Sequence, residues 1–238
     1  MIYGQWEVDF FLVLKPALGG TSAIFDTMYL AKTPSIVKPL AGDLVWDIPT
    51  SQREVFLTFD DGPVPEVTPQ VLDILDEYGA KGTFFCVGEN VERHPEIFLD
   101  LLDRGHSVGN HTWSHENGWR TSQMSYLKSV LRCEELVNSK LFRPPYGRIR
   151  RQQAEALRNR FHLIMWDVLA GDWDENRSVE QCVDTLIEYT RPGSVVVFHD
   201  SIKARDRVLQ ALPEYLRYLE VEGYTCSLLT EENTKSHG

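Results

Sequence analysis

Positive charge is scarce in this chain. Its 238 residues include 24 Lys and Arg against 35 Asp and Glu, which gives a formal net charge of −11. A nucleic-acid or anionic-membrane partner would require a basic stripe, and the sequence shows none. We therefore expect neither partner, and the same charge argues against a polyanionic substrate.

Long apolar runs are also missing. The apolar N-terminal stretch within MIYGQWEVDFFLVLKPALGG is short, follows Glu7 and Asp9, and contains Lys15. A secretory signal begins with basic residues and has a longer apolar run, and a membrane-spanning helix needs about 20 apolar residues. The sequence therefore predicts no signal segment and no membrane span. We expect a cytoplasmic protein, and a monomer.

Cysteine pairs of the CxxC type do not occur. The four cysteines are widely spaced and lie mostly inside apolar or amphipathic runs, which favours buried free thiols over disulfides. They are Cys86, Cys133, Cys182 and Cys226.

The composition, 42% hydrophobic and 25% charged, is that of an ordinary globular protein with one large α/β domain. From residue 52 onward, short β-like runs alternate with amphipathic helical runs. This alternation implies a parallel sheet, either doubly wound or closed as a barrel. The predicted strands are Val55 to Phe59, Gly82 to Val87, His106 to Asn110, Leu141 to Arg143, His162 to Val168, Ser194 to Phe198 and Tyr224 to Leu228.

The predicted helices carry apolar residues at helical spacing. In TPQVLDILDEYGA, Val71, Leu72 and Leu75 share one face, Pro69 stands near the start and Gly79 is a stop signal. The other predicted helices are PEIFLDLLDRG, SYLKSVLRCEELVNS, RQQAEALRN, VEQCVDTLIEYTR and RVLQALPEYLRYLEVEG.

Conspicuous polar residues follow the ends of five different predicted strands. The carboxyl ends of parallel strands share one rim of the fold, where active sites are built, so these five groups are predicted to converge. They are Asp60 and Asp61; His111 and His115; Arg143 with Pro144, Pro145 and Tyr146; Asp167, Asp172 and Trp173; and His199 and Asp200.

The stretch HTWSH has its two histidines, His111 and His115, four residues apart. This spacing predicts two imidazoles on one side of a helical turn, as two ligands of one metal require. Alone, the pair could equally be surface or packing residues. Together with a carboxylate at the same rim, it predicts a facial site for Zn²⁺ or another divalent ion that holds a water.

The strand VFLTF runs directly into the adjacent carboxylates Asp60 and Asp61, followed by Gly62 and Pro63. Side chains alternate along a strand, so two acids point to opposite faces unless a turn redirects one of them. One aspartate can then bind the metal while the other takes a proton from the water. The alternative is a capping and turn pair, because Asp-Gly is a common turn signal.

These stretches, in this order, resemble the five motifs of the polysaccharide deacetylases, carbohydrate esterase family 4, which share a NodB-like homology domain. The resemblance covers roughly residues 52–230. It implies a distorted (β/α)₇ barrel, similar to a TIM barrel, and metal-dependent removal of acetyl groups from N-acetylated oligo- or polysaccharide containing N-acetylglucosamine. The motifs are TFDDGP (58–63), HTWSH (111–115), RPPYG (143–147), GDW (171–173) and VFHD (197–200).

By position in the first two motifs, the resemblance makes Asp60 the general base. It makes Asp61, His111 and His115 the ligands of one divalent ion, with Zn²⁺ expected and Co²⁺, Ni²⁺ or Mn²⁺ as alternatives.

In the third motif, Arg143 would orient Asp60 by a charge-assisted hydrogen bond, and the backbone N–H of Tyr146 would help to stabilise the oxyanion. Arg143 could instead form a surface ion pair, and the Tyr146 ring could be a packed aromatic.

The last two motifs contain the residues that correspond to the general acid and its partner. His199 resembles the general acid that protonates the leaving amine, with Asp172 as its charge partner. Trp173 and Val197 resemble the apolar walls of the acetyl-methyl pocket, and Pro144 is assigned to the same pocket. His199 could instead be a rim residue whose hydrogen bonds are already satisfied, and Trp173 and Val197 could be plain core.

Two departures from the family pattern concern this pocket. The fourth motif commonly has an aspartate three residues before the Asp-Trp pair; here that position is Leu169, and an acid stands at Asp167 instead. Val197 replaces a usual leucine. Both changes put the pocket's shape and the substrate range in doubt more than the chemistry.

The resemblance divides the chain into a deacetylase domain at residues 52–230, an extension at residues 1–51 that packs on or flanks the barrel, and a tail at residues 231–238. Two other functions compete with the N-deacetylase. One is an esterase that acts on O-acetylated sugar with the same site. The other is a carbohydrate-binding scaffold on an inactive deacetylase fold.

Overall fold

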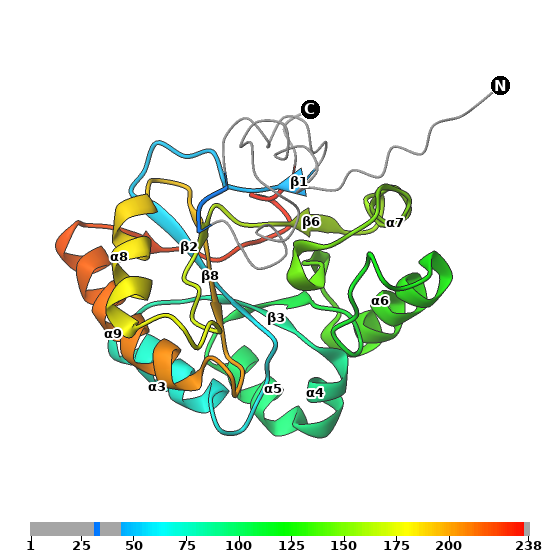
Figure 1. The fold of residues 1–238 in the computed structure, drawn as a ribbon, viewed down its shortest axis with the longest axis horizontal. Coiled ribbons are helices and arrows are strands. Elements are labelled where there is room, and N and C mark those ends of the chain that lie inside the picture. Colours follow the sequence, from blue (N-terminus) through cyan, green and yellow to red (C-terminus); the bar gives the residue numbers. More distant parts are fainter. Residues whose placement is uncertain (1–30, 34–43, 236–238) are drawn as a thin grey trace.

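The computed structural model describes residues 31–33 and 44–235. Its strands form one curled sheet, and each pairing between the strands of that sheet is parallel (Figure 1). Helices cover the outer face, and the architecture is a distorted (β/α) barrel. The barrel alternative of the sequence analysis is therefore confirmed.

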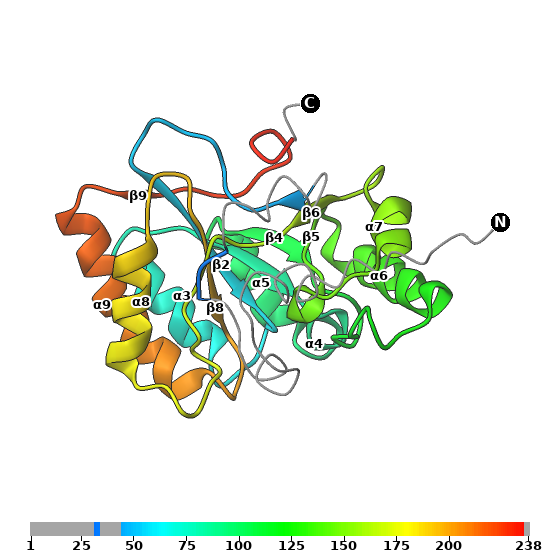
Figure 2. The same cartoon turned by 45° about the horizontal axis from the view of Figure 1, so that its top comes forward.

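The strands follow the order β1-β6-β5-β4-β3-β2-β8-β7, and β9 pairs with the beginning of β2. Figure 2 shows β2, β8, β4, β5 and β6 in the middle of the molecule with helices around them. The bounds are β1 (Leu44–Val45), β2 (Glu54–Asp60), β3 (Thr83–Cys86), β4 (Ser107–Asn110), β5 (Leu141–Phe142), β6 (His162–Ile164), β7 (Val168–Leu169), β8 (Val195–His199) and β9 (Thr225–Cys226).

In Figure 1, α8 and α9 lie on one side of the sheet, α6 and α7 on the other, and α3, α5 and α4 between them. Local sequence explains several helix ends: Ser122 and Ser178 accept N-cap hydrogen bonds, and Asn138 ends α6 in the left-handed conformation. The bounds are α3 (Thr68–Glu77), α4 (Gly88–Arg93), α5 (Pro95–Asp103), α6 (Gln123–Val137), α7 (Arg151–Leu157), α8 (Val179–Tyr189) and α9 (Arg205–Val221).

Two apolar layers hold the barrel. Alternate residues of β2 and β8 point outward and pack under the helices, as Leu57, Phe59 and Phe198 do. The residues between them point inward, where Phe56 packs with Phe85 and other inner-face side chains. Because both faces of the sheet are covered, its strands read as nearly continuous apolar runs rather than as alternating ones.

Most predicted elements correspond to single elements of the structure, but the run from His162 to Val168 does not. It splits into β6 and β7, which pair with different strands, β5 and β8. Asp167 therefore stands at the beginning of β7 and not at the end of a strand. The prediction that Asp167 joins the polar rim is wrong.

Asp167 belongs to a buried network at the opposite end of the barrel. Its side chain is fully buried and accepts hydrogen bonds from the Arg191 guanidinium and from the hydroxyl of Ser194, which directly precedes β8. Arg191 also pairs with Asp47 at 2.6 Å. The acid at this position therefore supports the fold and does not replace the family's missing aspartate.

The N-terminal residues that the structure describes line the seam where the barrel does not close. Lys32 pairs with Val168 on the edge strand β7, and β1 pairs with β6 at the other end of the sheet. Asp47 forms a further bridge with Ser194. The rest of the predicted extension, residues 1–30 and 34–43, lies outside the described part of the chain.

The cysteine prediction is confirmed, since all four are free thiols and three of them are buried. Within residues 31–33 and 44–235, the structure has no helix that is both long and apolar enough to cross a membrane.

Replacing Asp167 by alanine should lower the free energy of unfolding by about 1–3 kcal/mol, because Ser194 and Arg191 lose a buried acceptor. Metal retention should not change, because Asp167 lies at the other end of the barrel from the polar rim. Denaturant unfolding and metal analysis of the purified variant would measure both. Asp47→Ala, which removes the more exposed partner of Arg191, is the control and should cost less. An equal loss in the two variants would contradict the buried role of Asp167.

Candidate active site

The adjacent aspartates at the end of β2 are separated by a change of backbone conformation. Asp60 closes the strand, and Asp61 has a φ of 84°, in the left-handed region that non-glycine residues rarely occupy. This turn redirects Asp61, so that both carboxylates face the carboxyl rim. Asp61 is held by a hydrogen bond from the Asn90 side-chain amide to its carbonyl, at 2.8 Å.

The histidines of HTWSH lie close together, but the backbone between them is not the predicted helical turn. The segment after β4 is a loop and not a helical turn, and both Thr112 (φ 65°) and His115 (φ 58°) are left-handed. The ring centroids of His111 and His115 still lie 5.1 Å apart. The predicted convergence holds, but the helical geometry predicted for it is wrong.

Side chains of neighbouring elements fix this loop. Asn110 accepts a hydrogen bond from the Thr112 N–H, and Ser129 of α6 accepts one from the Trp113 N–H. Glu116 in turn accepts the Ser129 hydroxyl at 2.6 Å. These bonds compensate for the cost of the left-handed residues, which is about 1–3 kcal/mol each.

Asp61, His111 and His115 form the cluster with the geometry of a metal site. One ligand atom from each lies within 4.8 Å of the other two. Oδ1 of Asp61 is 3.0 Å from Nε2 of His115 and 3.6 Å from Nε2 of His111. This enclosed oxygen accepts no well-formed hydrogen bond from the described residues. It is therefore an atom that a bound cation could contact.

The protonation of His111 is compatible with a cation at this point. Nδ1 of His111 lies 2.8 Å from the carbonyl oxygen of Arg143, and because a carbonyl can only accept, Nδ1 carries the proton. Burial lowers the pKa of His111 to about 4, so the ring is neutral at physiological pH. Its Nε2 lone pair then faces the Asp61 carboxylate. A divalent cation would accept both of these electron pairs.

The charge on Asp61 is consistent with this fit. Burial opposes ionisation, but His115, His199 and His111 hold the pKa of Asp61 well below its usual range. Two imidazole nitrogens and one carboxylate oxygen suit Zn²⁺ or a similar divalent ion. Nδ1 of His115 lies 3.1 Å from the Tyr146 hydroxyl, which can hold that ring with Nε2 toward the site.

Arg143 is fully buried and is not a surface ion-pair residue. Its guanidinium donates to Oδ1 of Asp60 and to the Thr58 hydroxyl, each at 2.7 Å, and to the carbonyl of Met165 at 2.9 Å. It also lies 4.1 Å above the Phe85 ring. The family pattern commonly has a second acid at the position of Leu169. Here, among the described residues, Asp60 is the one carboxylate that pairs with Arg143.

His199 and Asp172 form the second buried ion pair of the rim. Oδ1 of Asp172 lies 2.8 Å from Nδ1 of His199, and Oδ2 accepts the His199 backbone N–H at 2.7 Å. Burial alone would lower the pKa of His199, but the Asp172 carboxylate outweighs it and raises that pKa to about 9. His199 is therefore charged at neutral pH, with Nε2 left to donate a proton.

Tyr146 lies in a tight turn, with φ 60° and ψ 8°, after the buried Pro144 and Pro145. The turn is closed by the N–H groups of Gly147 and Arg148, and no described residue accepts a hydrogen bond from the Tyr146 N–H. The side chain of Tyr146 is 58% exposed, so the packed-aromatic alternative does not apply.

Two of the three residues assigned to the acetyl pocket, Trp173 and Val197, lie beside His199. The Trp173 ring is half-buried, and its centroid is 4.7 Å from that of His199. Val197 is buried and precedes His199 by two residues on β8, so both side chains lie on the inner face of the sheet. Pro144 is buried beside Arg143 in the chain.

The sequence analysis gave no role to three side chains that position the site. Thr58 shares the inner face of β2 with Asp60, and its spacing of two residues from Asp60 was the available signal. Asn90 lies in α4, which the sequence analysis did not predict. Asp200 accepts hydrogen bonds from the Gly62 N–H and the Thr68 hydroxyl, and so secures the turn after Asp61.

Comparison with known proteins agrees with this fold. Residues 47–160 match the family model described as polysaccharide deacetylase. A peptidoglycan-N-acetylglucosamine deacetylase of Bacillus cereus is 35% identical over 69% of this chain and 65% of its own length. A second Bacillus cereus protein of the same description is 32% identical over 80% of this chain and 92% of its own length. The chain thus spans less than two thirds of the first relative and nearly all of the second.

Among solved structures, the Bc1960 peptidoglycan N-acetylglucosamine deacetylase, in complex with a hydroxamate-type benzamide, is similar to this chain. It superposes with a TM-score of 0.76 at 32% identity, covering 83% of this chain and 95% of that one. The curled parallel sheet and its rim define a hydrolase of the carbohydrate esterase family 4 class. The chain belongs to the polysaccharide deacetylase family, whose enzymes hydrolyse the amide bonds of N-acetylated carbohydrates.

Replacing His111 by alanine should abolish metal retention, because it removes one of the three ligand atoms of the cluster. Metal content after gel filtration, measured by elemental analysis, tests this. His94→Ala removes a partly exposed histidine outside the cluster and should retain the metal. Full metal occupancy in His111→Ala would show that the ligand assignment is wrong.

Proposed function

We propose that this protein removes acetyl groups from N-acetylated carbohydrate, an oligo- or polysaccharide with N-acetylglucosamine units. The observation that carries the proposal is the presence of two buried ion pairs, Asp60 with Arg143 and Asp172 with His199, close to a three-ligand cluster. One pair can take a proton and the other can give one. Amide hydrolysis needs both, because an amide is a poor electrophile and an amine is a poor leaving group.

The cluster of Asp61, His111 and His115 would hold a divalent cation, for which we propose Zn²⁺. When bound, such an ion polarises the acetyl carbonyl and lowers the pKa of a water to about 7.

Asp60 is the proposed general base. Arg143 donates to its Oδ1, which fixes the orientation of the carboxylate and leaves Oδ2 as the oxygen that takes a proton from the attacking water. The buried guanidinium cannot move away without leaving its own charge unpaired. The base is therefore held in one position before substrate arrives.

His199 is the proposed general acid. Its Nδ1–H is engaged by Asp172, so the proton on Nε2 is the one delivered to the leaving nitrogen. The N–H of Tyr146, which faces no acceptor of the described residues, would stabilise the oxyanion. Trp173, Val197 and Pro144 would enclose the acetyl methyl group.

Two other functions, an O-acetyl esterase and a non-catalytic scaffold, are less well supported by these residues. An esterase that acts on O-acetylated sugar could use the same base, but an alcohol depends less than an amine on the positioned acid that His199 provides. A non-catalytic scaffold has no use for two buried ion pairs, which are costly to maintain away from water. The full set of charged groups supports an active N-deacetylase.

Asp60→Asn should retain the metal and lose roughly two to four orders of magnitude in the rate of acetate release, the usual share of general-base catalysis. Acetate released from N-acetylated chitooligosaccharides by the metal-loaded protein measures the rate. Parallel assays on acetylated xylan and on peptidoglycan fragments separate N- from O-deacetylation. Loss of metal in Asp60→Asn would mean that the roles of base and metal ligand are assigned to the wrong aspartates.

His199→Ala should reduce amide hydrolysis far more than hydrolysis of an activated acetyl ester. A basic amine must be protonated to depart, whereas a phenol leaves readily without help. Rates on both substrates, with metal content unchanged, test the role. An equal fall on both substrates would make His199 a binding residue.

Asp172→Asn should shift the alkaline limb of the pH–rate profile to lower pH. Asp172 raises the pKa of His199, so removing its charge lowers that pKa, and the imidazolium is lost at a lower pH than in the unsubstituted protein. The profile of kcat/KM on an N-acetylated oligosaccharide gives the measurement. An alkaline limb that stays in place would exclude His199 as the group that titrates there.

A further inference from the structure

The proposed metal ligands follow two strands that are not neighbours in the sheet. Asp61 follows β2 and His111 follows β4, while β3 lies between those strands and pairs with both. Strands two positions apart are separated by about 9–10 Å, yet one ligand atom from each member of the cluster lies within 4.8 Å of the others. The two ligand segments must therefore approach each other across the end of β3, where the next residues of the chain lie.

The segment after β3 bonds to the first ligand segment through a backbone donor and a side-chain donor. The Val87 N–H donates to the Gly62 carbonyl at 2.9 Å, and the Asn90 side-chain amide donates to the Asp61 carbonyl at 2.8 Å. A carbonyl oxygen only accepts, so the Nδ2 end of the Asn90 amide faces Asp61. Two consecutive carbonyls are thus fixed by residues 87–90, which we call the bridging segment.

The bridging segment also bonds to the second ligand segment. The Gly88 N–H donates to the Thr112 carbonyl at 3.0 Å. The Glu89 N–H donates to the Trp113 carbonyl at 2.8 Å. Both acceptor residues lie between the two histidine ligands in the chain. Four consecutive residues therefore tie the aspartate turn to the histidine loop.

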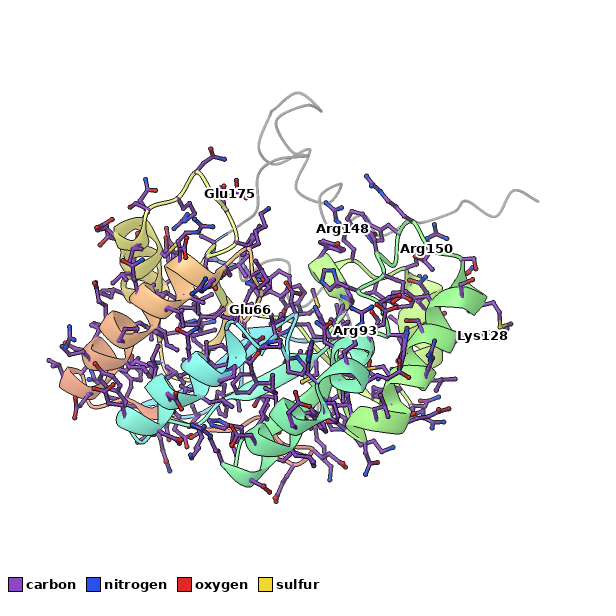
Figure 3. All side chains as sticks on the ribbon, turned by 90° about the horizontal axis from the view of Figure 1, so that it is seen from below. Glu66, Arg93, Lys128, Arg148, Arg150 and Glu175 are labelled. Atoms are coloured by element: carbon purple, nitrogen blue, oxygen red, sulfur yellow. The ribbon has the colours of Figure 1, made fainter. Side chains whose placement is uncertain are left out.

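Packing strengthens the histidine side of this connection. Figure 3 shows α4, which ends at Arg93, next to α6, which carries Lys128. The Trp113 side chain is buried, and a Cβ built on Gly88 would stand 2.6 Å from its ring. The Arg132 guanidinium of α6 lies 3.4 Å from the centroid of the same ring. Backbone bonds and packing both hold the histidine loop, so this side does not depend on a single side chain.

The aspartate side depends more strongly on Asn90. Asp61 has a φ of 84°, a strained conformation for a residue other than glycine, and the direction of its carboxylate follows from that conformation. Val87 and Asp200 hold the next residue, Gly62, whereas Asn90 holds Asp61 itself. Among the described residues, Asn90 is the member of the bridging segment whose side chain bonds to a ligand segment.

We propose that Asn90 is a positioning residue of the metal site. Its amide holds the Asp61 turn against the bridging segment, and so sets the distance of the Asp61 carboxylate from the two histidines before a metal binds. The proposal rests on the metal site of the proposed function and names a residue that sets its affinity. A site whose ligands are already in place does not have to order them on binding, and residues that orient metal ligands usually contribute about ten- to hundredfold in affinity.

The test measures Zn²⁺ binding to the metal-free protein by competition with a chromogenic chelator. Asn90→Ala should bind Zn²⁺ roughly tenfold more weakly, because the metal itself then has to order the Asp61 carboxylate. Asn90→Leu fills a similar space without a hydrogen-bond donor, and it should lose as much affinity as Asn90→Ala.

Two further variants separate positioning from a general loss of stability. Asp167→Ala removes a buried acceptor at the other end of the barrel, and Arg93→Ala removes a surface ion pair on the same helix as Asn90. Both should bind Zn²⁺ as tightly as the unsubstituted protein. Denaturant unfolding of the metal-free proteins gives the stability of each variant. Asn90→Ala should differ from Asp167→Ala in Zn²⁺ affinity even where the two are equally destabilised.

Unchanged Zn²⁺ affinity in Asn90→Ala, or an equal fall in Asn90→Ala and Asp167→Ala, would overturn the positioning role. Full affinity in Asn90→Leu would also overturn it, because filling the space would then be sufficient. Failure of the proposed function would look different. In that case the Zn²⁺-loaded protein would release no acetate from N-acetylated oligosaccharide, while the comparison of Zn²⁺ affinities would still decide the role of Asn90.

Discussion

The buried guanidinium of Arg143 is the group on which both the barrel and its site depend. It joins the Thr58 hydroxyl and the Asp60 carboxylate of β2 to the carbonyl of Met165 after β6, and so links strands from both halves of the sheet. Its own carbonyl fixes the ring of His111. An uncompensated buried charge costs several kcal/mol, so the chain must close around Arg143 in the one arrangement that satisfies it. That arrangement positions the proposed base Asp60 and the proposed metal ligand His111 at the same time.

Leu169 alters this network in a way that the fold accommodates. Where the family commonly places a second acid, this chain has an apolar residue that is buried on β7 beside Val197. The guanidinium completes its hydrogen bonds with a hydroxyl and with main-chain carbonyls, which are neutral acceptors. Asp60 consequently does not share the positive charge of Arg143 with another carboxylate of the described residues, and its orientation rests on that one ion pair.

Much of the fold and the gathering of the site followed from the sequence, because parallel strands deliver their carboxyl ends to one rim regardless of detailed geometry. The sequence did not predict the points at which the backbone changes direction. The apolar run from His162 to Val168 carries no sign that it changes partner strand in the middle. The left-handed conformations of Thr112 and His115 depend on Ser129, which belongs to the following helix and is held by Glu116, and a β-branched threonine gives no local hint of them.

The charges around the reaction centre are balanced in a way that suits its chemistry. Asp60 with Arg143 and Asp172 with His199 are each neutral as pairs, so neither opposes charge that develops between them. A divalent cation bound as proposed by the carboxylate of Asp61 and the imidazoles of His111 and His115 would leave one net positive charge at the centre. That is the sign and the magnitude that a developing oxyanion needs, in surroundings where water screens it little. A second acidic ligand would cancel this charge, which gives a physical reason for a site built from two histidines and one aspartate.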